Sequence, residues 1–276
     1  MNQRIAFQGE PGAYSHEACQ TARPEMEALP CESFEEVIAT AREGRADFAM
    51  LPVENSTYGR VADIHRLLPE SGLRIVGEAF VRVRISLMAL PGTRIEEIHT
   101  ARAHPVLLPQ SANFLKTNGI KGVAAPDSAG AAAALAKSKT PGEGVLASAL
   151  AAEIYGLDLL ARDIEDHGHN TTRFVIMGRE MDTTPRGSLG MMTTFIFEVR
   201  NIPAALYKAM GGFATNGVNM TKLESYMVDG SFTATRFYAD IDGHPDDPAV
   251  QRALDELAYF TSHIDILGVY PADRER

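Results

Sequence analysis

The sequence contains few cysteines, no long apolar run and no excess of positive charge. Among its 276 residues are 2 cysteines, Cys19 and Cys31, too few for the disulfide framework of a small secreted domain. The apolar stretches at residues 129–136 and 145–152 are much shorter than the ~20 residues that a membrane-spanning helix needs. No export signal is visible at the N-terminus, so we expect a cytoplasmic protein without a membrane anchor.

The balance of charge also limits the partners of this chain. There are 26 Lys and Arg residues against 36 Asp and Glu residues, which gives a formal net charge of -10. Broad attraction to nucleic acid or to an anionic membrane is therefore not expected, although a local anion-binding pocket remains compatible with the composition. The length is about twice that of the commonest domain, which favours a two-domain protein.

Residues 4–178 alternate short apolar runs with helical patterns, as expected of an α/β protein. Ser33 and Glu36 have the spacing of a capping box, and Asp127 and Ser128 should cap an alanine-rich helix. A helix over residues 149–155 should stop at Gly156. Residues 73–90 are expected to form one long strand-like stretch.

A second domain is predicted after the turn-forming segment at residues 182–188. The patterns that follow predict strands at residues 192–199, 218–227, 232–241 and 264–269, with helices at 203–215 and 247–260. This βαββαβ order is typical of a ferredoxin-like sandwich.

Common catalytic and cofactor motifs are incomplete. Gly9 and Gly12 follow a strand, but Phe7 stands where a dinucleotide-binding loop needs its first glycine. His167 and His169 alone do not make a metal site, and a solvated polar loop is the simpler interpretation. No Gly-x-Ser-x-Gly elbow is present, which gives little support to acyl transfer.

Clusters of neutral hydrogen-bonding groups remain, together with one guanidinium. They lie at Ser15, at residues 54–56, at residues 110–111, at Ser128 and at residues 172–173. Such groups suit the binding and polarisation of an oxygen-rich anion better than proton abstraction by a strong base. Each cluster taken singly could instead be a helix cap or a turn.

Together these residues resemble the prephenate dehydratase family. The resemblance rests on Gly9 to Ser15, on residues 52–56, on His104-Pro105 with Gln110, and above all on Asn170 with Thr172-Arg173-Phe174. The βαββαβ module after the linker resembles an ACT regulatory domain, so the similarity covers nearly the whole chain.

The resemblance implies conversion of prephenate to phenylpyruvate in phenylalanine biosynthesis, with no metal or organic cofactor. It implies a catalytic domain over residues 1–182 that is folded like a type II periplasmic binding protein. Lobe 1 would take about residues 1–78 and 160–182, lobe 2 about residues 79–159, and the ACT domain residues 190–276. No nucleic acid or membrane partner is implied, and a homodimer or homotetramer is expected.

The resemblance also implies the site residues. Thr172 would donate a hydrogen bond or proton to the leaving hydroxyl, and Arg173 would pair with a carboxylate. The substrate-binding residues would be Ser15, Glu54, Asn55, Ser56, Gln110, Ser128, Asn170 and Phe174. In a regular strand Thr172 and Arg173 face opposite sides, so we expect an irregular backbone at residues 170–173 if both reach the substrate.

Phenylalanine is the expected effector of the second domain. Its binding residues would be Ala204, Ala205, Leu206, Asn216, Asn219, Glu224 and Ser225. Relatives carry glycine where this chain has Ala204, and Arg-Pro where it has Tyr226 and Met227, so the effector response is open. Two alternatives to the main hypothesis also remain: an arogenate dehydratase, and a non-catalytic protein that binds or senses a small anion.

Overall fold

The computed structural model describes residues 3–181, 190–227 and 234–276. It divides into two compact units. The first unit comprises Met1–His65 and Ala79–Phe174, and the second comprises Arg66–Glu78 and Val175–Arg276. No helix within the described ranges combines the length and the hydropathy needed to cross a membrane.

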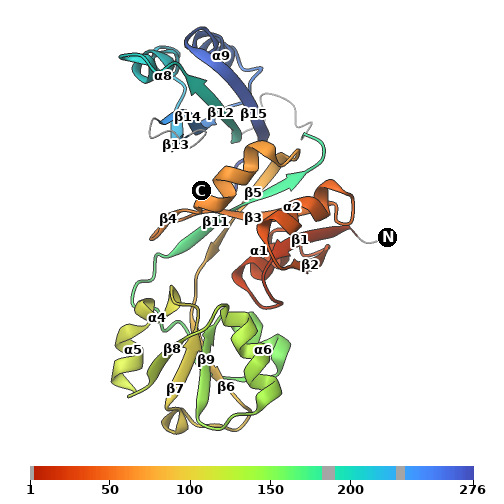
Figure 1. Ribbon diagram of the computed structural model, residues 1–276, viewed down its shortest axis with the longest axis vertical. Helices are drawn as coiled ribbons and strands as arrows, with labels where there is room; N and C mark the ends of the chain where they lie inside the picture. Colours follow the sequence, from red (N-terminus) through yellow and green to blue (C-terminus); the bar gives the residue numbers. More distant parts are fainter. Residues whose placement is uncertain (1–2, 182–189, 228–233) are drawn as a thin grey trace. The chain divides into compact units, whose positions relative to one another are not determined.

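The strands of the first unit belong to two sheets. Up to the first crossing between units, the elements are β1 (Arg4–Gln8), α1 (Tyr14–Ala22), β2 (Glu27–Cys31), α2 (Phe34–Arg42), β3 (Phe48–Asn55), β4 (Gly59–Arg60) and α3 (Ala62–Leu67). Strands β2, β1 and β3 pair in parallel, with Ile5, Ala6 and Phe7 of β1 completely buried. Figure 1 shows α1 and α2 beside this group of strands.

The second sheet of the first unit has the strand order β10-β6-β9-β7-β8. Its elements are β6 (Ser86–Ala89), η2 (Ile95–Glu97), β7 (Thr100–Ala103), α4 (Leu107–Gln110), α5 (Ala112–Thr117), β8 (Lys121–Ala124), α6 (Ser128–Ser138), β9 (Glu143–Ala147), α7 (Ala149–Tyr155) and β10 (Asp158–Ala161). Leu87, Ala101 and Leu146 from its central strands are fully buried in one core. Its strands lie between Ser86 and Ala161, and a separate second lobe stays a prediction.

The predicted helix ends are confirmed. The Ser33 hydroxyl accepts the backbone N–H of Glu36 at 3.2 Å at the start of α2. Asp127 caps α6 by accepting the N–H of Gly130 at 2.6 Å, and Gly156 ends α7 in the left-handed conformation. These ends are fixed by short-range chemistry, which is why the local sequence predicts them.

The predicted long strand at residues 73–90 is wrong. The structure has β5 (Arg74–Arg82) and β6 with an irregular segment between them, because the chain leaves one sheet and enters the other. The N–H of Val83 donates to the carbonyl of Asn170, and that of Ile85 donates to a Glu165 carboxylate oxygen. Both residues are buried, so the sequence carries no sign of the break.

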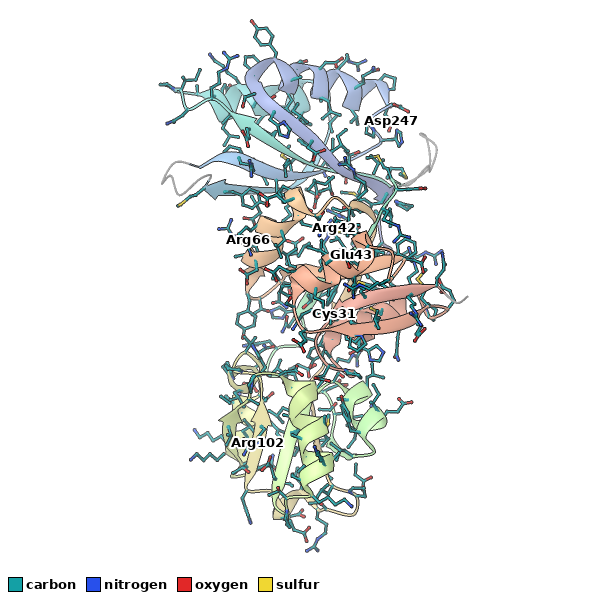
Figure 2. The ribbon with its side chains drawn as sticks, turned by 45° about the vertical axis from the view of Figure 1, so that its right-hand side comes forward. Cys31, Arg42, Glu43, Arg66, Arg102 and Asp247 are labelled. Carbon is teal, nitrogen blue, oxygen red and sulfur yellow. The ribbon has the colours of Figure 1, made fainter. Side chains whose placement is uncertain are left out.

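The second unit has the predicted βαββαβ order. It follows η1 (Leu68–Glu70) and the shared strands β5 and β11 (Thr171–Gly178), and consists of β12 (Met191–Val199), α8 (Ala205–Thr215), β13 (Met220–Met227), β14 (Ala234–Asp242), α9 (Pro248–Phe260) and β15 (Thr261–Pro271). The strand order β13-β14-β12-β15 is antiparallel throughout, as in a split-βαβ sandwich. Figure 1 shows α8 and α9 together on one face, and Asp247 stands at the head of α9 (Figure 2).

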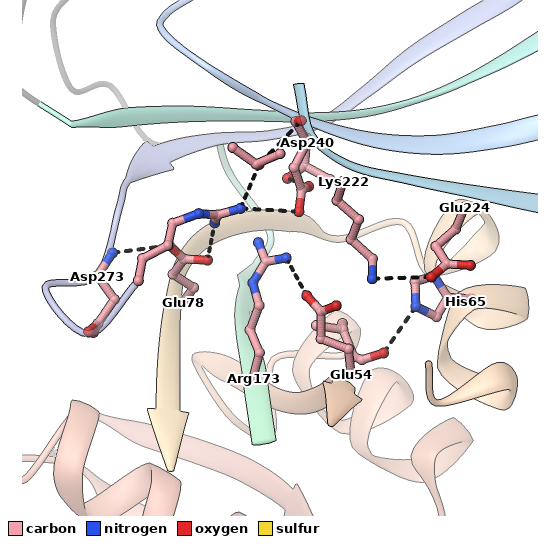
Figure 3. A network of polar contacts seen from close by, with 12 residues as sticks. Glu54, His65, Glu78, Arg173, Lys222, Glu224, Asp240 and Asp273 are labelled. Atoms are coloured by element: carbon pink, nitrogen blue, oxygen red, sulfur yellow. Dashed lines mark hydrogen bonds and ion pairs between the residues drawn. The ribbon is translucent and has the colours of Figure 1, made fainter. Parts of the chain in front are cut away.

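An ionic cluster joins three buried or half-buried side chains of the second unit. The Arg276 guanidinium lies 2.7 Å from a Glu78 carboxylate oxygen and 3.7 Å from an Asp240 oxygen. Figure 3 shows Glu78 on β5 and Asp240 on β14. Both carboxylates are 0% exposed, so the cluster is a fixed feature of this core rather than a surface ion pair.

The observed units differ from the predicted domains in two segments. Arg66–Glu78 and the end of β11 belong to the second unit, because β5 pairs in parallel with β15 at Ile75 and Gly268. A Cβ at Gly268 would lie 2.3 Å from the Ile75 carbonyl oxygen, so only glycine permits this approach. The predicted linker at residues 182–188 lies outside the described residues.

Candidate active site

A pocket of about 350 Å³ collects the segments that follow β1, β3, β7 and β9 in the first unit. The carboxyl ends of parallel strands are the usual place for a ligand in α/β folds. Of the residues predicted to contact the substrate, those that line this pocket are Ser15, Asn55, Gln110, Ser128, Asn170 and Thr172. Segments far apart in the sequence therefore meet at one site.

The loop after β1 needs its two glycines. Gly9 and Gly12 have φ values of 111° and 93°, which side chains rarely adopt. A Cβ at Gly12 would also lie 2.7 Å from the Cα of Ala151. The hydroxyl of Ser148 donates to the Gly12 carbonyl at 2.6 Å, which anchors the loop to the start of α7.

Helix N-termini supply positive potential at this pocket. Ala13 to Ser15 begin α1, and Asp127 to Ala129 begin α6, and both groups line it. No lysine or arginine is among the described lining residues. An anionic ligand would therefore depend on backbone N–H groups, helix dipoles and neutral side chains, although the capping carboxylate of Asp127 opposes part of this field.

Tyr14 adds a phenol that stays protonated. Its hydroxyl donates to the carbonyl of Arg84 at 2.9 Å. Burial raises the pKa of Tyr14 well above its usual range, and nearby Glu17 and Glu165 raise it further. Tyr14 is thus a neutral wall of the pocket and not a base.

A chain of amide groups connects the polar residues of the pocket. The Nδ2 of Asn55 donates to the Asn170 Oδ1 at 2.6 Å and to the Thr172 Oγ1 at 3.0 Å. The Nδ2 of Asn170 donates to the Gln110 Oε1 at 2.5 Å, and the Gln110 Nε2 donates to the Val106 carbonyl at 2.8 Å. Asn170 is 3% exposed, so these hydrogen bonds take the place of the ones that its amide would otherwise make with water.

The structure contradicts the expected position of Arg173. Residues 171–178 form the regular strand β11, so Arg173 points to the side opposite Thr172, as strand alternation requires. Its side chain is 3% exposed and its Nη1 lies 2.9 Å from a Glu54 carboxylate oxygen (Figure 3). Neither residue lines the pocket. This ion pair instead joins β3 to β11, next to Asn55 and Thr172.

Two further predicted residues also lie outside the pocket lining. The Ser56 hydroxyl donates to the His169 carbonyl at 2.9 Å and accepts the Thr171 N–H at 2.9 Å, so it joins two chain segments. Phe174 is 1% exposed and belongs to the core. Ser128 does line the pocket, but its hydroxyl already accepts the backbone N–H of His104 at 2.9 Å.

Several lining residues were not predicted from the sequence to contact the substrate. Tyr58, Val83, His104 and Ser148 all contribute to the pocket wall. His104 directly follows β7, and Asn55 is the last residue of β3. This position at the end of a strand is the signal that could have identified His104 as a lining residue. Val83 carries no such signal, because it lies in the break between two sheets.

The cysteines do not contribute a nucleophile. Cys19 and Cys31 are both buried as free thiols, away from the pocket lining. Burial raises the pKa of Cys19 to about 12, so its thiol stays protonated and unreactive at neutral pH.

In the second unit, some of the predicted effector residues lie together. Ala204, Ala205 and Leu206 line a hollow of about 260 Å³ at the start of α8. Asn216, Asn219, Glu224 and Ser225 do not line it. Asn216 instead donates to Glu256, and Asn219 donates to Asp242.

Comparison with known proteins relates the chain to one family. A family model described as prephenate dehydratase matches residues 5–182. The bifunctional N-acyl-homoserine lactone acylase/prephenate dehydratase of Komagataeibacter europaeus is 52% identical over 268 residues, which is 97% of this chain and 95% of that protein. The chloroplastic arogenate dehydratase/prephenate dehydratase 1 of Arabidopsis thaliana is 38% identical over 287 residues, which is 99% of this chain and 73% of that protein.

A solved structure with the same fold is that of prephenate dehydratase from Arthrobacter aurescens in complex with L-Phe. It has a TM-score of 0.87 and 28% identity, and the match covers 97% of this chain and 89% of that chain. The likeness extends beyond the range of the family model, into the second unit.

Proposed function

Because this chain belongs to the prephenate dehydratase family of lyases, we propose that it converts prephenate to phenylpyruvate, carbon dioxide and water in L-phenylalanine biosynthesis. The observation that carries this proposal is the pocket, which combines hydroxyl and amide donors with helix N-termini and has no lysine or arginine among its described lining residues. Prephenate presents two carboxylates and a ring hydroxyl, which are the oxygen-rich groups that such donors bind.

The reaction needs orientation and an acid more than a base. The electron pair of the ring–carboxylate bond moves into the ring as carbon dioxide leaves. The bond from the ring to its hydroxyl then breaks with its electron pair on oxygen, and the ring becomes aromatic. A proton from the Thr172 hydroxyl converts the departing oxygen to water, and a proton taken up from solvent restores the Thr172 hydroxyl, so the reaction consumes one proton overall. Neutral donors placed at this developing charge stabilise the transition state most strongly in a pocket that excludes water.

The remaining residues have supporting roles in this proposal. Ser15, Asn170 and Gln110 offer hydrogen-bond donors to the substrate carboxylates, and Tyr14 closes the wall. The Arg173–Glu54 ion pair holds β3 beside β11, so it positions the ends that carry Asn55 and Thr172. The pocket of the first unit is lined by residues at the ends of strands from two sheets. This supports a type II periplasmic-binding-protein-like arrangement of the catalytic part.

We propose further that the second unit is an ACT domain with phenylalanine as its effector. Its βαββαβ order and the L-Phe in the Arthrobacter aurescens complex support this assignment. The hollow beside Ala204 and Leu206 is the candidate site. Tyr226 and Met227, in place of the usual Arg-Pro, predict an effector response that differs from that of relatives. A homodimer or homotetramer would complete this domain.

A second candidate function is suggested by the 52% identity to a bifunctional acylase. Hydrolysis of an acyl-homoserine lactone amide needs a nucleophile with a base beside it. In the pocket, Ser128 accepts the backbone N–H of His104 and does not bond to the imidazole ring. The His104 Nδ1 in turn accepts the Val106 N–H at 3.3 Å. The geometry therefore favours the dehydratase as the main activity.

The test offers purified protein three substrates in parallel: prephenate, arogenate and an N-acyl-homoserine lactone. Formation of phenylpyruvate at the highest kcat/KM supports the proposal. Formation of phenylalanine from arogenate at a higher kcat/KM would assign the chain to the arogenate branch. Release of homoserine lactone alone would favour the acylase. Binding of prephenate without any product would favour the non-catalytic alternative.

A further inference from the structure

The amide orientation of Asn55 is fixed by its own backbone neighbours. Its Oδ1 accepts the N–H of Thr57 at 2.9 Å and the N–H of Tyr58 at 3.0 Å. A backbone N–H can only donate, so the oxygen must face these residues. The Nδ2 therefore points the other way, toward Asn170 and Thr172.

Both hydrogens of this Nδ2 are already used. One goes to the Asn170 Oδ1 and the other to the Thr172 Oγ1. A side-chain amide nitrogen has two donors, so Asn55 has no hydrogen left for a ligand even though it lines the pocket. Asn55 can influence a bound substrate only through the groups that it holds.

The contact with Thr172 sets the direction of the threonine hydroxyl. Because Oγ1 accepts from Asn55, its own hydrogen must point elsewhere, and the described residues include no acceptor that it bonds to. Thr172 lines the pocket, so its unspent O–H is available to a ligand there. The Asn55 N–H also stabilises negative charge on Oγ1 as its proton leaves.

The rest of the amide chain prevents a flip. Asn170 and Gln110 continue the same donor direction to the carbonyl of Val106. Turning the Asn55 amide around would place its oxygen against the Asn170 Oδ1 and its nitrogen against two N–H donors. The chain therefore allows one orientation, determined at one end by backbone N–H groups and at the other by a backbone carbonyl.

We propose that Asn55 is a positioning residue that acts through Thr172: it aims the threonine hydroxyl into the pocket and makes it a better proton donor, without touching the substrate. This proposal rests on the proposed dehydratase function. It differs from the expectation drawn from the sequence, in which Asn55 contacts the substrate itself.

The test compares kcat and KM of Asn55→Asp in two backgrounds, wild type and Thr172→Val. The new carboxylate keeps the acceptor for residues 57 and 58 but loses both donors, and it draws the Thr172 hydrogen toward itself. In the wild-type background kcat should fall about 100-fold. KM should rise in both backgrounds, because the new carboxylate lines the pocket and repels an anionic substrate. In the Thr172→Val background the same change should alter kcat by less than about 2-fold.

Asn118→Asp is the matched control, because it makes the same chemical change at the exposed C-terminal end of α5. It should leave both constants unchanged. Phenylpyruvate is allowed to accumulate over hours, so the residual rates in the Thr172→Val background can be measured.

The outcomes separate this proposal from the one it rests on. An equal loss of kcat in both backgrounds would overturn the role of Asn55, since its effect would not pass through Thr172. A change confined to KM, with kcat unchanged in the wild-type background, would also overturn it, because Asn55 would then not act on the Thr172 hydroxyl. A folded wild-type chain that turns over neither prephenate nor arogenate would instead overturn the dehydratase function, and this role with it.

Discussion

In the first unit, the connected polar groups of the pocket are neutral amides and one hydroxyl, whereas the second unit contains an ionic cluster of two buried carboxylates and one arginine. The amide chain from Asn55 to Gln110 leaves the Thr172 O–H unspent. In the ionic cluster, Arg276 reaches both Glu78 and Asp240, and Asp240 also accepts the Thr194 hydroxyl at 2.6 Å.

The two kinds of polar group serve different purposes, one for function and the other for stability. Hydrogen-bonding capacity that the chain itself does not use is available to a ligand, so it marks the site of chemistry. Buried charges that are paired within the chain mark places where removal of one partner is costly. The two kinds of polar group occur side by side in β3. Glu54 forms an ion pair with Arg173 within the chain, whereas its sequence neighbour Asn55 lines the pocket.

The largest effect on stability is expected from Arg173→Met. This change leaves the Glu54 carboxylate without the guanidinium of a side chain that is 3% exposed. The free energy of unfolding should fall by about 3 kcal/mol, measured by urea denaturation. An unfolding free energy equal to that of wild type would show that this pair does not behave like the ionic cluster.

A somewhat smaller loss is expected from Arg276→Ala. The two carboxylates it serves are 0% exposed, but the arginine itself is 21% exposed, so solvent screens part of the interaction. We expect a loss of roughly 2 kcal/mol in the free energy of unfolding. Arg274→Ala, at an exposed neighbouring position, is the control. Equal unfolding midpoints for the two variants would show that the ionic cluster does not stabilise the fold.

A gain in stability is expected from Ala204→Gly. Ala204 caps α8 with φ 63° and ψ 14°, the left-handed conformation that is unfavourable for any residue with a Cβ. Glycine should raise the free energy of unfolding by about 1 kcal/mol, measured from the midpoint of thermal unfolding. Ala205→Gly, one position further along and inside α8, should lower it instead. A lower midpoint for Ala204→Gly would mean that the observed backbone carries no strain.

The smallest effect concerns pH and His16. Burial lowers the pKa of His16 from 6.5, and its Nδ1 accepts the Gly12 N–H at 3.0 Å, which requires the neutral ring. The unfolded chain therefore takes up a proton before the folded one. The contribution of His16 is complete above pH 6.5 and is lost as the pH falls below it. Between pH 7 and pH 5, the loss of stability should be smaller for His16→Gln than for wild type, and an identical loss would contradict this.

Local features of the fold could be predicted from the sequence, and long-range features could not. The caps at Ser33 and Asp127 and the stop at Gly156 depend on neighbouring residues alone, and each is confirmed. Strand β2, which contains Pro30, and the short strand β10 have no clear alternation and were missed. The break between β5 and β6 depends on which sheet each half joins, which is a tertiary property.

The candidate site shows the same division. The motif identified Thr172 and Asn170 as neighbours in sequence, and both line the pocket. Strand alternation already conflicted with a shared role for Thr172 and Arg173, and the regular strand resolves that conflict against Arg173. The link from Asn55 to Thr172 spans 117 positions, so no local pattern could reveal it.

The proposed role of Thr172 as proton donor is tested most directly by the rate of phenylpyruvate formation from prephenate, measured for wild type and for Thr172→Val. Valine has nearly the shape of threonine, with a methyl group in place of the hydroxyl, and circular dichroism establishes that the variant is folded. We expect a fall in kcat of about 10²–10³-fold with little change in KM. A folded Thr172→Val variant with the wild-type kcat would contradict this role.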